Sequence, residues 1–172
     1  MYLKIFGSIV VLSGFSFLGF YYAYKPLYRK NDLCELKRGL LCLVSEIKFL
    51  SSLNEAILNI EKNLNNPIKT IFINFRQNME EKRGENLSKL WQDALNKGKK
   101  QTYFTKEDIE NINVIGKIIG SLDKDFSIDA LNIVIQYIDD TTKIIDKEKI
   151  KTFKMYQSLG VLSGLMIVIL LI

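Results

Sequence analysis

The clearest pattern in the chain is a pair of stretches in which apolar residues recur at alternating intervals of three and four. This spacing is typical of helices that pack through one face, as in coiled coils. The two seams consist of Leu33, Leu36, Leu40, Leu43, Ile47 and Leu50, and of Ile128, Leu131, Ile135, Ile138, Thr142 and Ile145. Each seam spans 18 residues, or about 27 Å of helix. We expect the two helices to be antiparallel and to pack together.

Shorter helices are predicted between the seams. Ser52 with Glu55, and Thr105 with Asp108, have the spacing of a capping box, in which side chains satisfy the backbone at a helix start. Pro67 suits a first helical turn, and Gly84 and Gly98 are expected to end helices. The predicted helices therefore cover about 27–51, 52–66, 67–83, 87–97, 105–119 and 126 onward. A polar, basic loop is expected at 97–101.

Charge is absent from both ends of the chain. Residues 5–24 and 155–172 contain no Asp, Glu, Lys or Arg, whereas 25–154 hold all 19 acids and every Lys and Arg except Lys4. A helix of about 20 apolar residues crosses the hydrocarbon core of a bilayer. The sequence predicts an all-α protein with transmembrane helices at 1–24 and 155–172 and a helical bundle of about six helices at 25–154.

Each predicted span has a structural alternative. A cleaved signal peptide would also place Lys4 before an apolar stretch, but no A-x-A-like cleavage site follows residue 20. A buried core helix is the alternative for the C-terminal stretch, which lacks a polar face. We expect both seam helices to continue into the spans, with Pro26 producing a kink or a break in the first.

Basic residues flank the predicted spans on the side of the middle domain. They are Lys25, Arg29, Lys30, Lys37 and Arg38 after the first span, and Lys143, Lys147, Lys149, Lys151 and Lys154 before the second. The positive-inside rule then places the middle domain on the cytoplasmic side of the cell membrane and both termini outside. These charges suit membrane lipids and give no support to nucleic-acid binding.

The composition offers little material for catalysis. The chain contains no His and two Cys, so the commonest general base and metal ligand is missing. Cys34 and Cys42 lie too far apart along one helix for a disulfide between them. No phosphate-binding loop, hydrolase or zinc motif occurs. We therefore expect no enzyme activity, catalytic residue, cofactor or metal; an enzyme would need a site built from acids such as Glu46.

Two features are candidate contact sites. Lys97, Lys99 and Lys100 form a basic cluster suited to an acidic partner, although an exposed loop needs no partner. Gly160 and Gly164 form a GxxxG motif, which lets membrane helices approach closely. Their partner is either another subunit or the first span, where Gly7 and Gly14 share one face.

The chain resembles the stage III sporulation protein AB family of endospore-forming bacteria nearly end to end, and several segments carry the resemblance. The most specific is K-M-Y-Q-S-L-G-V-L-S-G-L at 154–165, similar to the family's K-M-Y-R-x-L-G-V-L-G-G-L. G-F-Y-Y-A at 19–23 resembles the end of the family's first span. Further similarity occurs at Ser45–Ile47, Leu53–Ile57, Pro67–Phe72, Trp91–Leu95 and Ile118–Asp123.

The resemblance implies a function. Family members are similar in their soluble part to type II secretion platform (GspF-like) proteins, and act in a secretion-like complex between mother cell and forespore. The expected partners are a cytoplasmic ATPase (stage III sporulation protein AA) and other membrane components, with Arg38 and Glu46 as candidate contacts. The alternative is a membrane-anchored helical protein that assembles with itself, a homo-oligomer without an ATPase.

Overall fold

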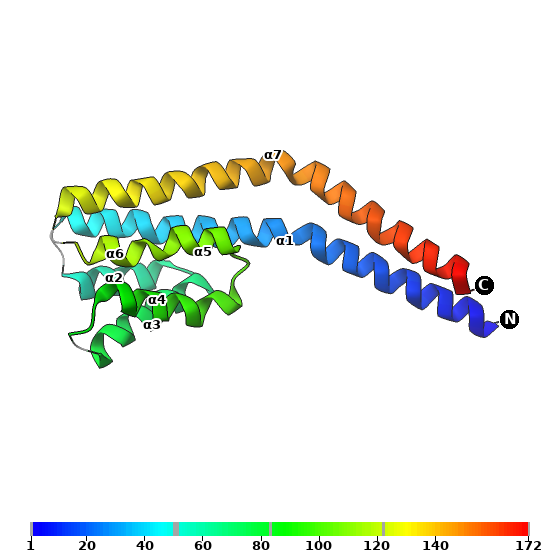
Figure 1. Ribbon diagram of the computed structural model, residues 1–172, viewed down its shortest axis with the longest axis horizontal. Coiled ribbons are helices and arrows are strands. Elements are labelled where there is room, and N and C mark those ends of the chain that lie inside the picture. Colours follow the sequence, from blue (N-terminus) through cyan, green and yellow to red (C-terminus); the bar gives the residue numbers. More distant parts are fainter. Residues whose placement is uncertain (1, 50–51, 83, 122, 172) are drawn as a thin grey trace. The chain divides into compact units, whose positions relative to one another are not determined.

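The computed structural model describes residues 2–49, 52–82, 84–121 and 123–171 (Figure 1). Within these ranges every regular element is a helix, which confirms the predicted all-α class. The chain divides into two compact units. Unit 1 consists of Met1–Tyr28 and Ile144–Ile172, and unit 2 consists of Arg29–Lys143. The functional boundaries predicted at 24/25 and 154/155 stay predictions.

Two long helices run through both units. Helix α1 covers Tyr2–Lys48 and helix α7 covers Lys124–Leu171. Each therefore joins a seam to a terminal apolar stretch without interruption, as the pattern predicted. Pro26 lies inside α1 and does not break it. Leu50, the last residue of the first predicted seam, lies outside the described residues.

In unit 2, the seams of α1 and α7 form part of one core. Leu33, Leu36, Leu40 and Leu43 of α1 are fully buried, as are Leu131 and Ile138 of α7. The two helices run side by side in opposite directions within this unit (Figure 1). Lys37 Nζ of α1 lies 2.5 Å from Asp139 Oδ1 of α7, so an ion pair joins the two helices.

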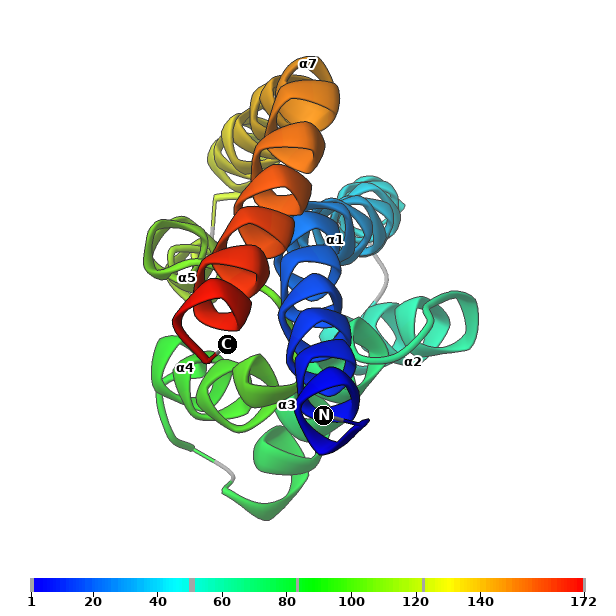
Figure 2. The same cartoon turned by 90° about the vertical axis from the view of Figure 1, so that its right-hand side faces the viewer.

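The short helices complete the unit 2 bundle. They are α2 (Leu53–Asn63), α3 (Ile68–Glu81), α4 (Leu87–Gly98), α5 (Lys106–Asn113) and α6 (Ile115–Ile119). The end-on view in Figure 2 shows α2, α3, α4 and α5 following one another around the bundle. Both predicted capping boxes are present, at Ser52–Glu55 and at Thr105–Asp108.

Two local predictions were wrong. Residues 105–119 form two helices, α5 and α6, which meet at Val114. A helix continuous with Ile112 and Ile115 would turn Ile119 inward, whereas after the interruption Ile118 is buried and Ile119 is half-buried. The expected loop at 97–101 is helical, because Lys97 belongs to α4 and Lys99–Gln101 form a 3-10 turn, η1.

The short helices pack around Trp91. Its side chain is fully buried, and its ring meets those of Phe72 and Phe75 edge-to-face with centroids 5.6 and 5.4 Å apart. This geometry is favourable for aromatic pairs. The indole Nε1 donates a hydrogen bond to the carbonyl oxygen of Ile112 at 3.1 Å. Trp91 therefore has a structural role in the core of unit 2.

In unit 1, the N-terminal part of α1 pairs with the C-terminal part of α7. The helices approach closely at two glycines, because a Cβ atom added to Gly160 would lie 3.0 Å from the Cα of Gly19. Aromatic rings extend the pairing beyond them. Tyr24 and Phe153 lie edge-to-face at 5.5 Å, and Tyr22 stacks on Tyr156 at 6.3 Å.

Among the described residues, one helical stretch, Lys124–Ile169, is long and apolar enough to cross a membrane. Only 11% of its most apolar window is buried, which disfavours the alternative of a soluble core helix. Leu162, Met166 and Ile169 are instead strongly exposed. The expectation that residues 1–24 also cross a membrane is not confirmed and stays a prediction.

Candidate functional site

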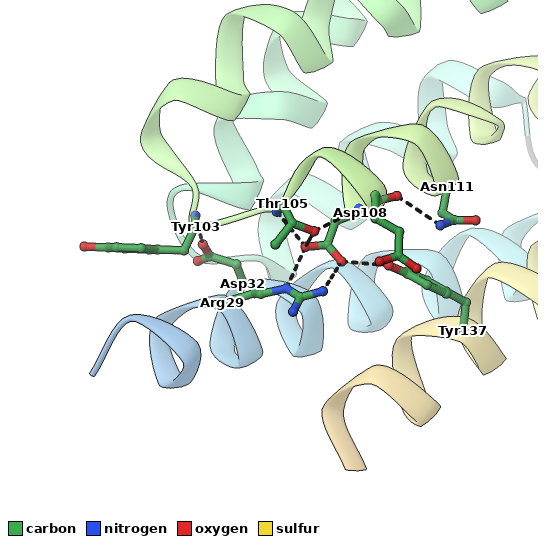
Figure 3. Close-up of polar contacts among 8 residues, drawn as sticks. Arg29, Asp32, Tyr103, Thr105, Asp108, Asn111 and Tyr137 are labelled. Carbon is green, nitrogen blue, oxygen red and sulfur yellow. Dashed lines mark hydrogen bonds and ion pairs between the residues drawn. The ribbon is translucent and has the colours of Figure 1, made fainter. Parts of the chain in front are cut away.

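The most elaborate polar arrangement in unit 2 surrounds Asp108, at the start of α5 (Figure 3). Its carboxylate accepts hydrogen bonds from Arg29 of α1, through Nε at 2.7 Å and Nη2 at 2.8 Å. It accepts another from the hydroxyl of Tyr137 of α7 at 2.9 Å. The Asp108 side chain is fully buried. One carboxylate thus joins three helices, and we call this cluster the Asp108 clamp.

Thr105 completes the clamp. Its backbone N–H and its hydroxyl both donate to Asp108 Oδ2, at 2.7 and 2.9 Å. The two carboxylate oxygens therefore receive five hydrogen bonds, which uses the roughly four acceptor positions of a carboxylate. A carboxylate so fully occupied by the fold is suited to holding helices together rather than to accepting a proton from a substrate.

A second carboxylate fixes the segment ahead of α5. Asp32, one turn after Arg29 on α1, accepts a hydrogen bond from the backbone N–H of Tyr103 at 2.7 Å. Asp32 is only 7% exposed. Figure 3 shows the Tyr103 ring directed away from Asp108. Residues 103–108 are consequently attached to the first turns of α1 in unit 2.

The electrostatics of the clamp follow from burial and hydrogen bonding. Burial alone would raise the pKa of Asp108, but the hydrogen bonds from Arg29, Thr105 and Tyr137 together lower it below its ordinary value. The hydrogen bond to Asp108 raises the pKa of Arg29. Burial, followed by the bond to Asp108, raises the pKa of Tyr137. The pair is therefore ionised and mutually neutralised near neutral pH.

The structure separates the five candidate partner-contact residues into two groups. Arg38 and Glu46 lie on α1 beside α2: Arg38 pairs with Glu35 at 2.9 Å and donates to the carbonyl oxygen of Asn63 at 3.1 Å. Glu46 accepts a hydrogen bond from Asn59 at 3.0 Å. Arg38 is exposed and Glu46 half-buried.

The other group consists of Lys97, Lys99 and Lys100, at the end of α4 and in η1. All three are exposed. Lys97 and Lys100 line a shallow surface hollow with Asp93 and Asn96. Lys99 donates a hydrogen bond to the side chain of Asn96 at 2.7 Å and borders a second hollow with Phe104 and Lys106.

The candidate membrane glycines also separate. Gly160 and Gly164 are buried in unit 1. Gly7 and Gly14 are exposed, and an added Cβ at either would meet nothing within 4 Å. Gly19, which sequence reasoning did not select as a contact, is the residue that meets Gly160. A contact of Gly7 or Gly14 with another subunit stays a prediction.

Comparisons with known proteins agree with this architecture. A family described as "Stage III sporulation protein AB" matches residues 4–172, nearly the whole chain. The chain belongs to the stage III sporulation protein AB family. This confirms the resemblance seen in the sequence. The stage III sporulation protein AB family is a structural sporulation family and not a known enzyme family.

A solved structure titled "Stage III sporulation protein AB (SpoIIIAB)" has the same fold. It superposes with a TM-score of 0.67 at 18% sequence identity, over 72% of this chain and 98% of that chain. A comparison with curated proteins finds no match.

The sequence of this stage III sporulation protein AB family member did not predict the Asp108 clamp. The Thr105–Asp108 capping box was visible from spacing alone. Arg29 lies 79 residues from Asp108, and no local pattern connects them. The one available signal was the presence of Arg29 and Asp32 on the first turns of a seam helix. Neither charge needs a partner there if it faces solvent.

Proposed function

We propose that this protein is a membrane platform component of a secretion-like channel complex between mother cell and forespore, required for endospore formation. Its terminal helices span the mother-cell membrane that faces the forespore. The unit 2 bundle lies in the cytoplasm and contacts the cytoplasmic ATPase, stage III sporulation protein AA. Other membrane components of the channel contact the terminal helices.

The observation that carries the proposal is the continuity of α1 and α7. Family membership supplies the sporulation context, and the two helices supply a mechanical one. Each runs from the core of unit 2 into unit 1 without a break. The buried seams and the Lys37–Asp139 pair fix both helices in the bundle. A displacement imposed on unit 2 would therefore reach the apolar segments through two helices rather than through flexible linkers.

The surface of α1 and α2 around Arg38 and Glu46 is the proposed ATPase contact. Along α1, Arg38 and Glu46 lie 9 and 17 residues beyond Arg29, or roughly 14 and 26 Å at the rise of an α-helix. A partner bound there acts on unit 2 away from the end at which α1 enters it. This separation along α1 leaves space for the ATPase on the cytoplasmic side of the membrane.

Inserted residues in α7 test the mechanical part. Two glycines between Lys151 and Thr152 introduce a flexible joint, because glycine costs about 1 kcal/mol per residue in a helix. Two alanines at the same position are the matched control, since they add the same length and keep the helix. In a strain that depends on this gene for sporulation, we expect the glycine insertion to lower heat-resistant spore counts far more than the alanine insertion.

Equal and normal spore counts for both insertions, with normal protein levels, would mean that the terminal helices are anchors only. The platform role itself depends on partner capture. Full-length protein should co-purify with an ATPase carrying a phosphate-binding loop, and R38E with E46K should reduce this yield. K117E, a charge reversal on the exposed face of α6, is the control for general surface charge.

The second candidate function is a self-assembling structural protein without an ATPase. The exposed glycines Gly7 and Gly14 favour it, because they leave a face of α1 open to another helix. Self-association of the purified chain with no ATPase in the eluate would favour this alternative. The hypothesis that the protein is an enzyme would gain support if E46Q abolished sporulation while folding and partner capture were unchanged.

A further inference from the structure

A short segment of unit 2 carries positive charge that the fold does not neutralise. Residues 96–106 contain four lysines and no acid. These lysines, Lys97, Lys99, Lys100 and Lys106, are exposed. Within the part of the chain that the structure describes, none of the four forms an ion pair. The nearby Asp93 is paired with Lys82 at 3.1 Å, and the Lys99 side chain donates to the neutral amide of Asn96. We call Lys97–Lys106 the basic segment.

The basic segment lies at the end of unit 2 where α1 enters it (Figure 1). The hydrogen bond from Tyr103 to Asp32 holds its middle against α1. The Asp108 clamp holds the C-terminal end of the segment against α1 through Arg29, which is the first residue of unit 2. Asp32 follows Tyr24, the last residue of the predicted first span, by eight residues of continuous helix, or about 12 Å. This distance is set by the chain itself.

The basic segment combines charge with apolar surface. Tyr103 and Phe104 are half-buried. Phe104 and Ile109 line a hollow with Lys99 and Lys106, together with Thr105 and Glu110. Aromatic rings and lysine stems beside ammonium groups suit the headgroup region of a bilayer, where apolar and polar surroundings meet.

We propose that the basic segment docks on the headgroups of anionic phospholipids in the membrane that the terminal helices enter. The inference rests on the proposed membrane attachment and not on the secretion role. Lys97, Lys99 and Lys100 then contact lipid, and the ATPase contact is confined to the surface around Arg38 and Glu46. Because Asp32 and the clamp fix the basic segment to α1, this contact sets how unit 2 is held against the bilayer.

Energetic considerations favour a measurable effect. A basic residue near an anionic membrane surface strengthens attachment by roughly five-fold, and the attraction falls off within a Debye length. Lysines of α7 ahead of the apolar stretch, at positions 147, 151 and 154, recur on one helical face and are exposed. They add to the attraction for the same anionic surface.

The test uses the full chain in lipid nanodiscs. Cys34 and Cys42 are replaced by serine, and a nitroxide label is attached to Q101C, in the exposed centre of the basic segment. The discs contain phosphatidylcholine alone, or phosphatidylcholine mixed with phosphatidylglycerol. Collisions of the label with a water-soluble nickel chelate and with oxygen report its immersion. We expect phosphatidylglycerol to reduce nickel accessibility several-fold and high salt to restore it.

Charge variants identify the cause. K97Q/K99Q/K100Q should abolish the effect of phosphatidylglycerol. The matched control, K62Q/K117Q/K124Q, removes the same charge from exposed lysines of α2, α6 and α7 and should leave the effect intact. Loss in both variants would mean a non-specific response to net charge and would overturn the proposal.

Other outcomes are equally decisive. Equal immersion of the label in both kinds of disc would mean that the terminal helices alone bring it near lipid, and would refute a role for the lysines. Shielding only on addition of the ATPase would make the segment a protein contact instead. A chain that inserts into discs but shows no lipid response refutes this inference alone, whereas a chain that does not insert refutes the proposed membrane attachment as well.

Discussion

Arg29 makes two parallel hydrogen bonds to Asp108, at 2.7 and 2.8 Å, and the Asp108 side chain is fully buried while Arg29 is 22% exposed. The pair joins the first residue of unit 2 to α5, and Tyr137 adds α7 through the same carboxylate. Three helices thus depend on one acid. Loss of Asp108 should therefore lower the stability of unit 2 and, as a result, disturb the position of the basic segment.

Removing the Asp108 charge should destabilise unit 2. D108N preserves the shape of the side chain but leaves the Arg29 guanidinium without its counter-ion. Breaking a buried ion pair by removing one partner costs about 3–5 kcal/mol, and the partial exposure of Arg29 places our expectation near the lower end. Urea unfolding of the full chain in detergent, followed by circular dichroism, measures the change. D140N is the control, because its pair with Lys143 is exposed and is worth about 0–1 kcal/mol.

The same carboxylate should make stability depend on acid pH. The folded pKa of Asp108 lies below its unfolded value of about 3.9. The stabilising contribution is therefore fully present above that unfolded value and is lost as the pH falls through the lower folded pKa. Unfolding free energies measured from pH 6 downward should decrease below about pH 4.

The acid dependence can be assigned by comparing two variants. D108N should show a flatter decrease than the natural sequence, since it has no carboxyl to protonate. Asp32 acts in the opposite direction, because burial raises its pKa and protonation in the folded state favours folding. D32N should therefore retain the acid-induced loss or steepen it. An unchanged pH profile in D108N would show that Asp108 is not the responsible group.

The helices of this fold could be predicted because their determinants are local. The seams repeat within a few residues, and each capping box consists of two side chains three positions apart. The break at Val114 could not be predicted, since Val114 is neither glycine nor proline and the nearest glycine, Gly116, lies inside α6. Tertiary packing accompanies the break: α6 approaches Trp91 so closely that a Cβ on Gly116 would lie 2.8 Å from the Cβ of Trp91.

The candidate contacts depend on distances that no local pattern contains. The sequence showed that Lys97, Lys99 and Lys100 form a basic cluster. Their position at the end of unit 2 near α1 follows from the hydrogen bond between Tyr103 and Asp32, which are 71 residues apart. Likewise, the three glycines in the unit 1 part of α1, Gly7, Gly14 and Gly19, are chemically equivalent partners for Gly160. The register between α1 and α7, set by all their other contacts, selects Gly19.

The contact of Gly19 with Gly160 predicts a steric effect in unit 1. A side chain at position 160 would meet the carbonyl oxygen of Phe15, 2.9 Å from an added Cβ, as well as Gly19. G160L should therefore separate the paired helices. G14L is the matched control, because an added Cβ at Gly14 meets nothing within 4 Å.

Oxidative cross-linking in membranes measures this separation. Cysteines replace Tyr24 and Phe153, whose ring centroids lie 5.5 Å apart, in a chain with Cys34 and Cys42 changed to serine. We expect G160L to reduce the cross-linked fraction several-fold and G14L to leave it unchanged. A reduction by G14L but not by G160L would contradict the glycine contact and would point to the exposed face of α1 instead.

Neighbouring positions on the seam helices should differ sharply in their tolerance of charge. Leu43 is fully buried, whereas Leu41 is 48% exposed on the same helix. Ile135 and Ile133 form the equivalent pair on α7, at 8% and 69% exposure. L43D loses about 1.5–3 kcal/mol of apolar burial and also places a carboxylate in the core, which costs several kcal/mol more.

That total approaches the 5–15 kcal/mol by which ordinary domains are stable. L43D and I135D should therefore lose the cooperative thermal transition of unit 2, while L41D and I133D should keep it within a few degrees of the natural sequence. Thermal unfolding of the four full-length variants in detergent, followed by circular dichroism, makes the comparison. A cooperative transition retained in L43D and I135D would show that the two seams do not form the core that holds α1 and α7 together.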